Sequence, residues 1–227
     1  MAKTEINRTD LQIETAFPFV KKFTDSEKET FLRNIQVREF SKGEYVHGGD
    51  GKCTGVIAVK HGRLRTYILS PEGKEVTLFR LLSADVCILS ASCMMKNIAF
   101  DVNVQAEENS VLIVLNPDYF DQLAMTKPEV EKFKNDIVAM RFSEVMWLVE
   151  QIMFMKMDRR IANFLVEMAN ITGKKAIDMS HQEIADNLGT AREVVSRILK
   201  YFENEGLITM SRKEIKILNL KQLMEIS

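Results

Sequence analysis

The spacing of the apolar residues changes once along this chain, near Asn116 and Pro117. From Val37 to about Leu115, short runs rich in Val, Ile, Leu, Phe and Thr are separated by glycine-containing breaks. This pattern is typical of short strands that recur about every 8–12 residues. After this point apolar residues recur three and four positions apart, which is typical of helices. We therefore expect an α+β protein whose N-terminal part is a β-barrel, roll or sandwich.

One long helix is predicted over Lys127–Met155, where the apolar residues form two stripes offset by one residue. Such a helix, about 43 Å long, exceeds what one small domain needs. We expect one stripe to pack on the β domain and the other on the same helix of a second copy, and the alternative is a core helix in a monomer. The residues expected at the dimer contact are Ile137, Met140, Val145, Leu148, Ile152 and Met155.

The spacing of residues 180–206 predicts a helix-turn-helix. Ser180 and Glu183 form a capping-box pattern at the start of a helix of about two turns. Gly189 can take the positive φ that ends this helix, and a longer helix follows Thr190 and Ala191. A short helix, a glycine corner and a longer helix together are typical of a helix-turn-helix.

The polar side of the longer helix is the candidate contact with DNA. Helical spacing places on one strip Arg192, Glu193, Ser196 and Arg197. Arginine can donate to guanine O6 and N7 and glutamate can accept from cytosine N4, so the strip fits a major groove. The alternative is an ordinary ion pair between Glu193 and Arg197 on a solvated helix.

Two further strands are predicted after this helix, Leu207–Met210 and Ile215–Leu218, and the four residues between them include Arg212 and Lys213. This hairpin indicates a wing whose basic tip could lie along phosphates. The whole chain carries 31 basic and 32 acidic residues, a net charge of −1. A nucleic-acid partner must therefore be bound by local positive charge.

The residues GTAREVVSRILKYFENEGLI (189–208), followed by IKILNLKQL (215–223), closely resemble the C-terminal domain of the Crp/Fnr family of bacterial transcription regulators. In the N-terminal half FSKGE (40–44), Gly49–Asp50, VKHG (59–62) and PEGKE (71–75) resemble the turns of the family's β-roll. The resemblance implies a β-roll sensor domain over residues 1–126, a dimerisation helix and hinge over 127–157, and a winged helix-turn-helix over 158–227.

The resemblance also implies that Arg192, Glu193, Ser196 and Arg197 read base edges. Ser196 beside Arg197 is similar to the fumarate-nitrate regulator branch, and Arg192 before Glu193 is similar to the cyclic-AMP receptor branch, so the half-site sequence stays open. The expected partners are double-stranded DNA with a pseudopalindromic operator, a second copy of the chain and RNA polymerase. Binding to a membrane is not expected. The residues expected at phosphates are Ser180, Gln182, Thr190, Lys200, Arg212 and Lys213.

The effector of the sensor domain is left open by the sequence. Residues 84–90, ADVCILS, lack the glycine-glutamate and arginine-serine pairs of the cyclic-nucleotide branch, and Asp85 would repel a phosphate, so a cyclic nucleotide is not expected. No cysteine precedes Cys53, which excludes the usual N-terminal iron–sulfur cluster. A redox signal, haem or another small effector remains open. The candidate effector residues are Cys87, Ser90, Ser92 and Cys93.

Several alternatives accompany this interpretation. The three cysteines form no C-x-x-C pair, so they indicate free thiols in a cytoplasmic protein, and Cys87 and Cys93 can equally be small buried apolar residues. The β-roll can be a scaffold in a constitutive regulator. A thiol-dependent enzyme using Cys87 or Cys93 is a remote alternative, because no histidine lies near either thiol in the sequence. We therefore expect a regulator and not an enzyme.

Overall fold

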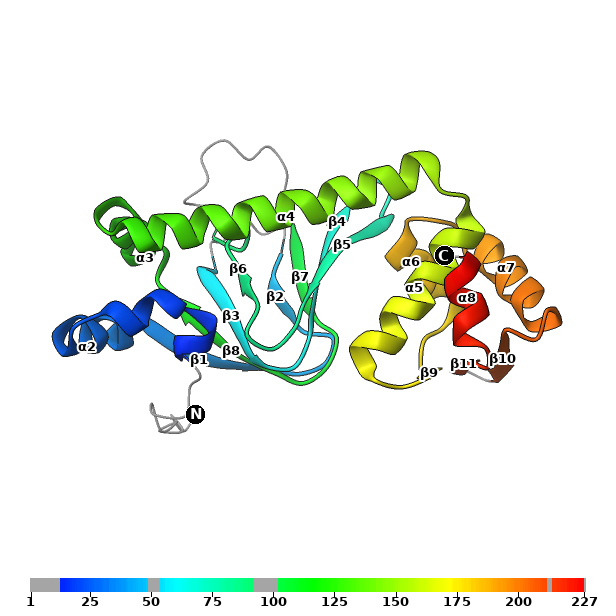
Figure 1. The fold of residues 1–227 in the computed structure, drawn as a ribbon, viewed down its shortest axis with the longest axis horizontal. Helices are drawn as coiled ribbons and strands as arrows, with labels where there is room; N and C mark the ends of the chain where they lie inside the picture. The colour runs from blue at the N-terminus through cyan, green and yellow to red at the C-terminus, as the bar shows by residue number, and fades with distance from the viewer. Residues whose placement is uncertain (1–12, 49–53, 92–101, 212–213, 227) are drawn as a thin grey trace. The chain divides into compact units, whose positions relative to one another are not determined.

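The computed structural model describes residues 13–48, 54–91, 102–211 and 214–226. The chain divides into two compact units, one comprising Met1–Ile68 and Leu78–Val145 and the other Leu69–Thr77 and Met146–Ser227. The elements in chain order (Figure 1) are α1 (Ile13–Ala16), the 3-10 helix η2 (Pro18–Lys22), α2 (Asp25–Arg33), β1 (Ile35–Phe40), β2 (Tyr45–His47), β3 (Val56–His61), β4 (Leu64–Leu69), β5 (Glu75–Leu81), β6 (Val86–Cys87), β7 (Asn103–Ala106), β8 (Ser110–Leu115), α3 (Pro117–Thr126), α4 (Pro128–Phe154), α5 (Met157–Thr172), β9 (Ala176–Ile177), α6 (His181–Leu188), α7 (Arg192–Asn204), β10 (Ile208–Ser211), β11 (Glu214–Ile217) and α8 (Leu220–Ile226).

Two four-stranded sheets form the N-terminal unit, in the orders β1-β8-β3-β6 and β2-β7-β4-β5. In the first sheet β8 pairs antiparallel with both β1 and β3, so that Leu115 lies opposite Ile35 on one side and Val56 on the other. In the second sheet β7 pairs antiparallel with β2 and β4. The apolar runs of the sequence that predict strands lie in β3, β4, β5 and β8, which confirms the α+β prediction.

Gly62 turns the chain between β3 and β4. Its φ is +99°, and a Cβ at this position would stand 2.7 Å from the backbone Cα of Ser110. Because backbone cannot move aside as a flexible side chain can, only glycine fits there. The predicted V-K-H-G turn is thus a real turn of the sheet.

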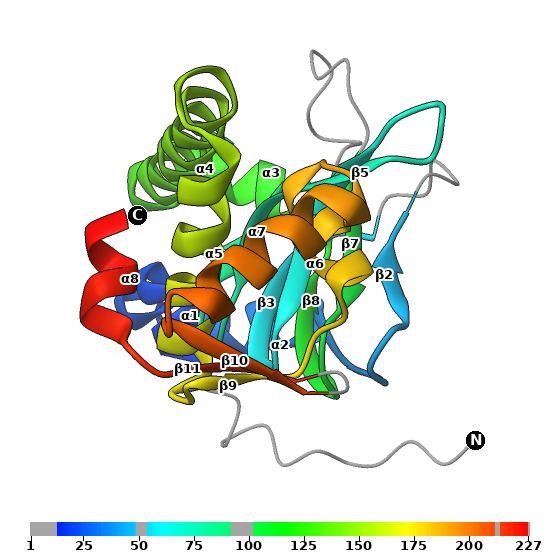
Figure 2. The same cartoon turned by 90° about the vertical axis from the view of Figure 1, so that its right-hand side faces the viewer.

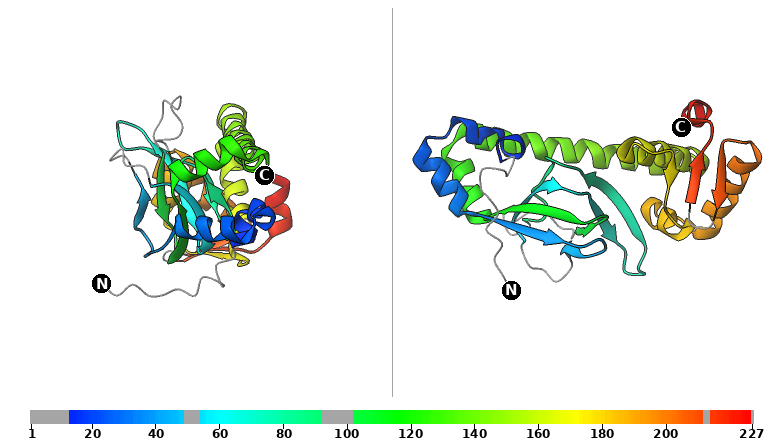
Figure 3. Two further views of the ribbon diagram at one scale, coloured as in Figure 1. Left: turned by 90° about the vertical axis from the view of Figure 1, so that its left-hand side faces the viewer. Right: turned by 90° about the horizontal axis from the view of Figure 1, so that it is seen from below.

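The N-terminal unit has two apolar clusters. One draws on strands of both sheets and includes Phe40, Leu64 and Leu112. The other packs the N-terminal helices against the first sheet and against α4, with the rings of Phe19 and Phe133 5.1 Å apart. The N-terminal part of α4 passes along the strands of its own unit (Figures 1 and 3).

A capping box starts α2, where the Thr24 backbone N–H donates to Glu27 Oε2 at 2.8 Å. The Glu27 carboxylate also accepts from Lys127 Nζ at 2.6 Å. These contacts, with that from Lys127 the largest, lower the pKa of Glu27 to about 2. Glu27 therefore caps α2 and also joins it to Lys127, the residue that immediately precedes α4.

The helix α4 runs from Pro128 to Phe154 as predicted, but its two apolar stripes differ from the expectation. Ile137 is only 7% exposed and packs in the core of its own unit, which leaves it little surface for a dimer contact. Met140 is 44% exposed, which leaves it available for the dimer contact at which it is expected. The next residue, Arg141, is buried, and its guanidinium packs 4.5 Å from the centre of the Phe79 ring.

In the C-terminal unit, helices pack on a small sheet with strand order β10-β11-β9. The helix α5 ends at Gly173, whose positive φ of +67° closes it. The wing strands β10 and β11 lie within one residue of the predicted ranges. The sequence pattern predicted neither β9 nor α8.

Candidate nucleic-acid interface

A complete capping box fixes the start of α6. The Glu183 N–H donates to Ser180 Oγ at 3.2 Å, and the Ser180 N–H donates to Glu183 Oε2 at 2.7 Å. At the other end Gly189 has φ +65°, as the predicted corner requires. The helix α6 therefore has both of its ends defined by local sequence, which places the start of α7.

The helix α7 separates an apolar side from a polar side. Val195, Leu199 and Phe202 are fully buried in the core of the C-terminal unit. On the other side the exposed residues are Arg192, Glu193, Arg197 and Lys200, and Ser196 is half-buried. Side chains in this arrangement can reach the base edges of a major groove without loss of core packing.

Hydrogen bonds join α7 to its neighbours on both sides. His181 Nδ1 of α6 lies 2.8 Å from Ser196 Oγ. Near the other end of α7, Glu203 accepts from Lys200 Nζ at 2.7 Å and from the Met210 N–H of β10 at 3.1 Å, and these two bonds lower its pKa. Figure 2 shows α6, α7 and the three strands of this unit next to one another. The wing is thus fastened to the candidate recognition helix.

The structure describes only some of the residues expected to contact phosphates. Ser180 and Thr190 are half-buried and Gln182 is exposed, with its amide donating to Asp186 Oδ1 at 2.7 Å. The Ser180 hydroxyl accepts the capping bond and still has its own hydrogen to donate. Arg212 and Lys213, at the tip of the wing, lie outside the described residues.

Arg160 is a residue that the sequence reasoning missed. It is buried in α5, and its guanidinium donates to the backbone carbonyl of Leu188, the last residue of α6, at 2.8 Å. Burial lowers the pKa of Arg160. Because this bond holds the C-terminal end of α6, Arg160 supports the corner of the helix-turn-helix. The Arg159–Arg160 pair in the sequence gives no signal that distinguishes the buried arginine from the exposed one.

The candidate effector residues divide between described and undescribed parts of the chain. Cys87 is 1% exposed in β6, and burial raises the pKa of its thiol, although bonds with Ser90 oppose the effect. The Ser90 hydroxyl is buried and donates to the Gly55 carbonyl at 2.8 Å. Ser92 and Cys93, like Cys53 and Gly49–Asp50, lie outside the described residues.

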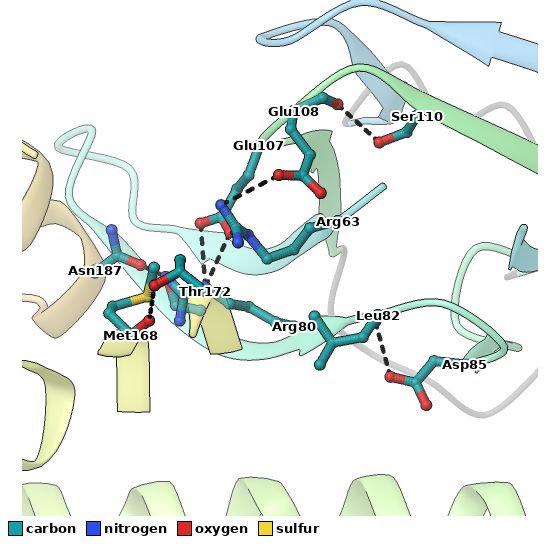
Figure 4. Close-up of polar contacts among 11 residues, drawn as sticks. Arg63, Arg80, Leu82, Asp85, Glu107, Glu108, Ser110, Met168, Thr172 and Asn187 are labelled. Carbon is teal, nitrogen blue, oxygen red and sulfur yellow. Dashed lines mark hydrogen bonds and ion pairs between the residues drawn. The ribbon is translucent and has the colours of Figure 1, made fainter. Parts of the chain in front are cut away.

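A buried ion-pair network in the N-terminal unit was also missed. The Glu107 carboxylate accepts from Arg63 Nε at 2.7 Å and from Arg80 Nε at 3.0 Å (Figure 4). Burial alone would raise the pKa of Glu107, but the charges and hydrogen bonds of the two arginines outweigh burial and lower it. The three residues are distant in the sequence, so no local pattern announces the network.

The described part of the chain has neither a metal-binding cluster nor a membrane-spanning helix. It contains no group of three or more His, Cys, Asp or Glu side chains arranged to hold a metal ion. None of its helices is long and apolar enough to cross a membrane.

Comparison with known proteins agrees with this geometry. Residues 159–226 match the Crp-like helix-turn-helix domain, and residues 37–127 match the cyclic nucleotide-binding domain. The chain is 30% identical over 199 residues to the transcriptional activator protein Anr of Pseudomonas protegens, covering 84% of this chain and 80% of that one. The chain belongs to the Crp/Fnr family of transcription regulators.

Two more members of the Crp/Fnr family show how far the similarity extends. The regulatory protein HlyX of Actinobacillus pleuropneumoniae is 28% identical and covers 88% of this chain, with 87% of its own length matched. The crystal structure of a Crp/Fnr-family regulator from Eubacterium rectale superposes with a TM-score of 0.89 at 41% identity, over 94% of this chain and 99% of that one. The fold prediction and the family prediction are therefore both confirmed, and the chain is a DNA-binding transcription regulator.

Proposed function

We propose that this Crp/Fnr regulator reads a two-fold pseudopalindromic operator with α7 in the major groove. Arg192, Glu193, Ser196 and Arg197 would contact base edges. The observation that carries the proposal is the division of α7 into a fully buried apolar side and a polar side held by the capped helix α6 and the wing. Such support fixes the direction of α7, and with it the positions from which the arginine side chains extend toward guanine.

The operator would be contacted by two copies of the chain joined through α4. Beyond residue 137 this helix exposes large apolar side chains, including Phe142 at 67% and Met153 at 67%. Of the predicted dimer residues, Met140 and Ile152 are exposed and Val145, Leu148 and Met155 are half-exposed. A second α4 would cover these side chains, as two helices do in a coiled coil. Ile137 is not part of this proposal.

The N-terminal unit would act as the sensor. We propose that the sensor domain ends at residue 126, that the dimerisation helix and hinge span residues 127–157, and that the DNA-binding domain begins at residue 158. An effector or redox signal there would change how the two α4 helices pack and so shift the population of DNA-competent dimers. The effector would not be a cyclic nucleotide, because the expected phosphate-binding pairs are absent and the Asp85 carboxylate occupies the segment, accepting from the Leu82 N–H at 2.8 Å. RNA polymerase would be a further partner, and the protein would act in the cytoplasm.

The enzyme alternative is weakened by the state of Cys87. A nucleophilic cysteine needs a lowered pKa and exposure, whereas Cys87 is buried with a raised pKa. The scaffold alternative, a constitutive regulator, remains a competitor that experiment must separate from a sensor.

Selection of preferred operators from random duplexes tests the proposed function. The protein is used reduced, air-oxidised and loaded with haem, and the bound sequences are compared. A pseudopalindrome with G and C at the read positions supports base reading by α7. A change of affinity between the three preparations supports a sensor, and identical affinities support the scaffold alternative. Absence of any preferred sequence at moderate ionic strength, in all three preparations, contradicts the proposal.

A further inference from the structure

His181 and Ser196 make a hydrogen bond between the two helices of the helix-turn-helix. His181 is the first residue of α6, and Ser196 lies at the start of the second turn of α7, beside Arg197. His181 Nδ1 and Ser196 Oγ are 2.8 Å apart, and both residues are half-buried. A serine within a helix often donates to the carbonyl four residues earlier, but Ser196 has an imidazole ring as its partner.

The direction of this bond decides what Ser196 can offer to DNA. A serine hydroxyl has one hydrogen to donate and lone pairs that accept. When the imidazole donates from Nδ1, the hydroxyl hydrogen stays available for a base. When the imidazole accepts at Nδ1, that hydrogen is consumed and Ser196 can only accept. The two directions therefore favour opposite sets of base edges.

We propose that His181 is a positioning residue that determines the base preference of Ser196, by donating from Nδ1 so that the Ser196 hydroxyl donates to the major groove. This inference rests on the proposed reading of base edges by Ser196. The 2.8 Å distance between Nδ1 and Oγ suits a bond in either direction, and only donation from Nδ1 leaves the hydroxyl hydrogen of Ser196 available for a base. The preferred base edge is then an acceptor: a purine N7, guanine O6 or thymine O4.

The expected effect is a gain in specificity. An unconstrained serine can pair with donors and acceptors alike, so it contributes little discrimination. A serine fixed as a donor makes no hydrogen bond where its hydroxyl faces the N6 amino group of adenine or the N4 amino group of cytosine. A single hydrogen bond of this kind corresponds to about a three- to tenfold preference.

Four variants test the inference: His181→Ala, His181→Asn, Ser196→Ala and the double variant His181→Ala/Ser196→Ala. Asparagine places an amide N–H near the position of Nδ1 and can donate from there. Binding of the full-length protein is measured on a set of operators that carry each of the four base pairs at every half-site position. Thermal unfolding of each variant confirms that it is folded.

Ser196→Ala should lose about three- to tenfold discrimination at one base pair. His181→Ala should lose the same preference at the same base pair, His181→Asn should restore it, and the double variant should match Ser196→Ala alone. A uniform loss of affinity on every operator with His181→Ala, persisting in the Ser196→Ala background, would overturn the inference. So would a failure of His181→Asn to restore the preference.

Failure of the proposed function gives a different result. If the wild-type protein prefers no duplex, the recognition of DNA by α7 is wrong, whatever the role of His181. If the wild type selects an operator and Ser196→Ala leaves its preference unchanged, Ser196 reads no base and the inference about His181 is wrong, while reading by Arg192, Glu193 and Arg197 stands.

Discussion

Arg197 is the residue whose side chain most directly tests reading of bases. It is exposed on α7, and its fork can donate to two acceptors of one guanine. Arg197→Ala should therefore cost about 1–3 kcal/mol of binding free energy and relax the preference at one base pair. Lys213→Ala, at a position outside the described residues, should weaken binding to all sequences alike. Mobility shifts over single-base operator variants measure both, and equal loss on every variant with Arg197→Ala would refute direct reading.

Glu107 tests the buried network of the N-terminal unit. Glu107→Gln removes the carboxylate that pairs with both Arg63 and Arg80, so the free energy of unfolding should fall by about 1–3 kcal/mol at pH 7. The matched control is Glu29→Gln, which removes an exposed i,i+4 pair with Arg33 and should change stability by less than about 0.5 kcal/mol. Urea unfolding measures both variants.

The pH dependence of the same two variants follows from the direction of the pKa shift. Because the pKa of Glu107 is lowered in the folded protein, its contribution is complete above its unfolded-state pKa and is lost as the pH falls through the folded-state value. The difference in unfolding free energy between wild type and Glu107→Gln should therefore shrink on acidification below about pH 4. A difference that is constant from pH 7 to pH 3 would contradict this account.

The roles of residues that follow a local pattern could be predicted from the sequence. The roles that depend on partners distant in the sequence could not. The capping pair Ser180/Glu183 lies three residues apart and forms as expected, and Thr24/Glu27 has the same local spacing. Arg141 interrupts the apolar stripe of α4 because the carbonyl of Val86 and the ring of Phe79 receive it. Nothing near Arg141 in the sequence reveals those partners.

At the scale of elements, the cap of α6 separates stability from DNA binding. Ser180→Ala removes the side-chain acceptor of the Glu183 N–H and should lower the free energy of unfolding by about 1 kcal/mol. Operator affinity should fall as well, because α6 places α7. Thr24→Ala is the matched control: it removes the equivalent bond of α2 and should cost similar stability with operator affinity unchanged. Calorimetry and mobility shifts test the pair, and equal affinities of the two variants would contradict the role of α6.

The long helix α4 provides the test of the dimer. Ile152 is 49% exposed, and Ile152→Asp places a carboxylate in the proposed apolar contact, where its desolvation is costly. The dimer should dissociate about 100-fold more readily, which corresponds to about 3 kcal/mol. Met125→Asp, on an exposed position of α3, should leave the dimer intact. Sedimentation equilibrium measures both, and an unchanged dimer with Ile152→Asp would place the contact elsewhere.

Elements with a strong period were predictable, and short ones were not. The short apolar runs between Val37 and Leu115 predicted strands, which include β3, β4, β5 and β8, and the three-and-four spacing predicted the long helix α4. The strand β9 has two residues and joins its sheet through Lys216 and Ile215 of β11, which are distant in the sequence. A two-residue strand has no period to detect, so only its partner defines it.

At the scale of the whole molecule, the proposed dimer carries one recognition helix in each copy. Two such helices bind one operator when their spacing matches a turn of DNA, about 34–36 Å. In the proposed mechanism, an effector in the sensor would act by changing the population of dimers that have this spacing. The order of domains along the sequence was predictable because each domain has its own period and turn residues. The effector was not predictable from Cys87 and Ser90, because both residues are buried and Ser90 is hydrogen-bonded to the backbone of its own domain.

Binding of the wild-type protein to operators whose half-sites are moved apart tests the central claim most directly. The selected operator is compared with versions that carry 5 and 10 inserted base pairs between the half-sites, at one salt concentration. Two recognition helices held at a fixed spacing predict that both insertions reduce binding to the level of a single half-site. Affinity that is the same for all three spacings would contradict the account, because each copy would then read DNA alone.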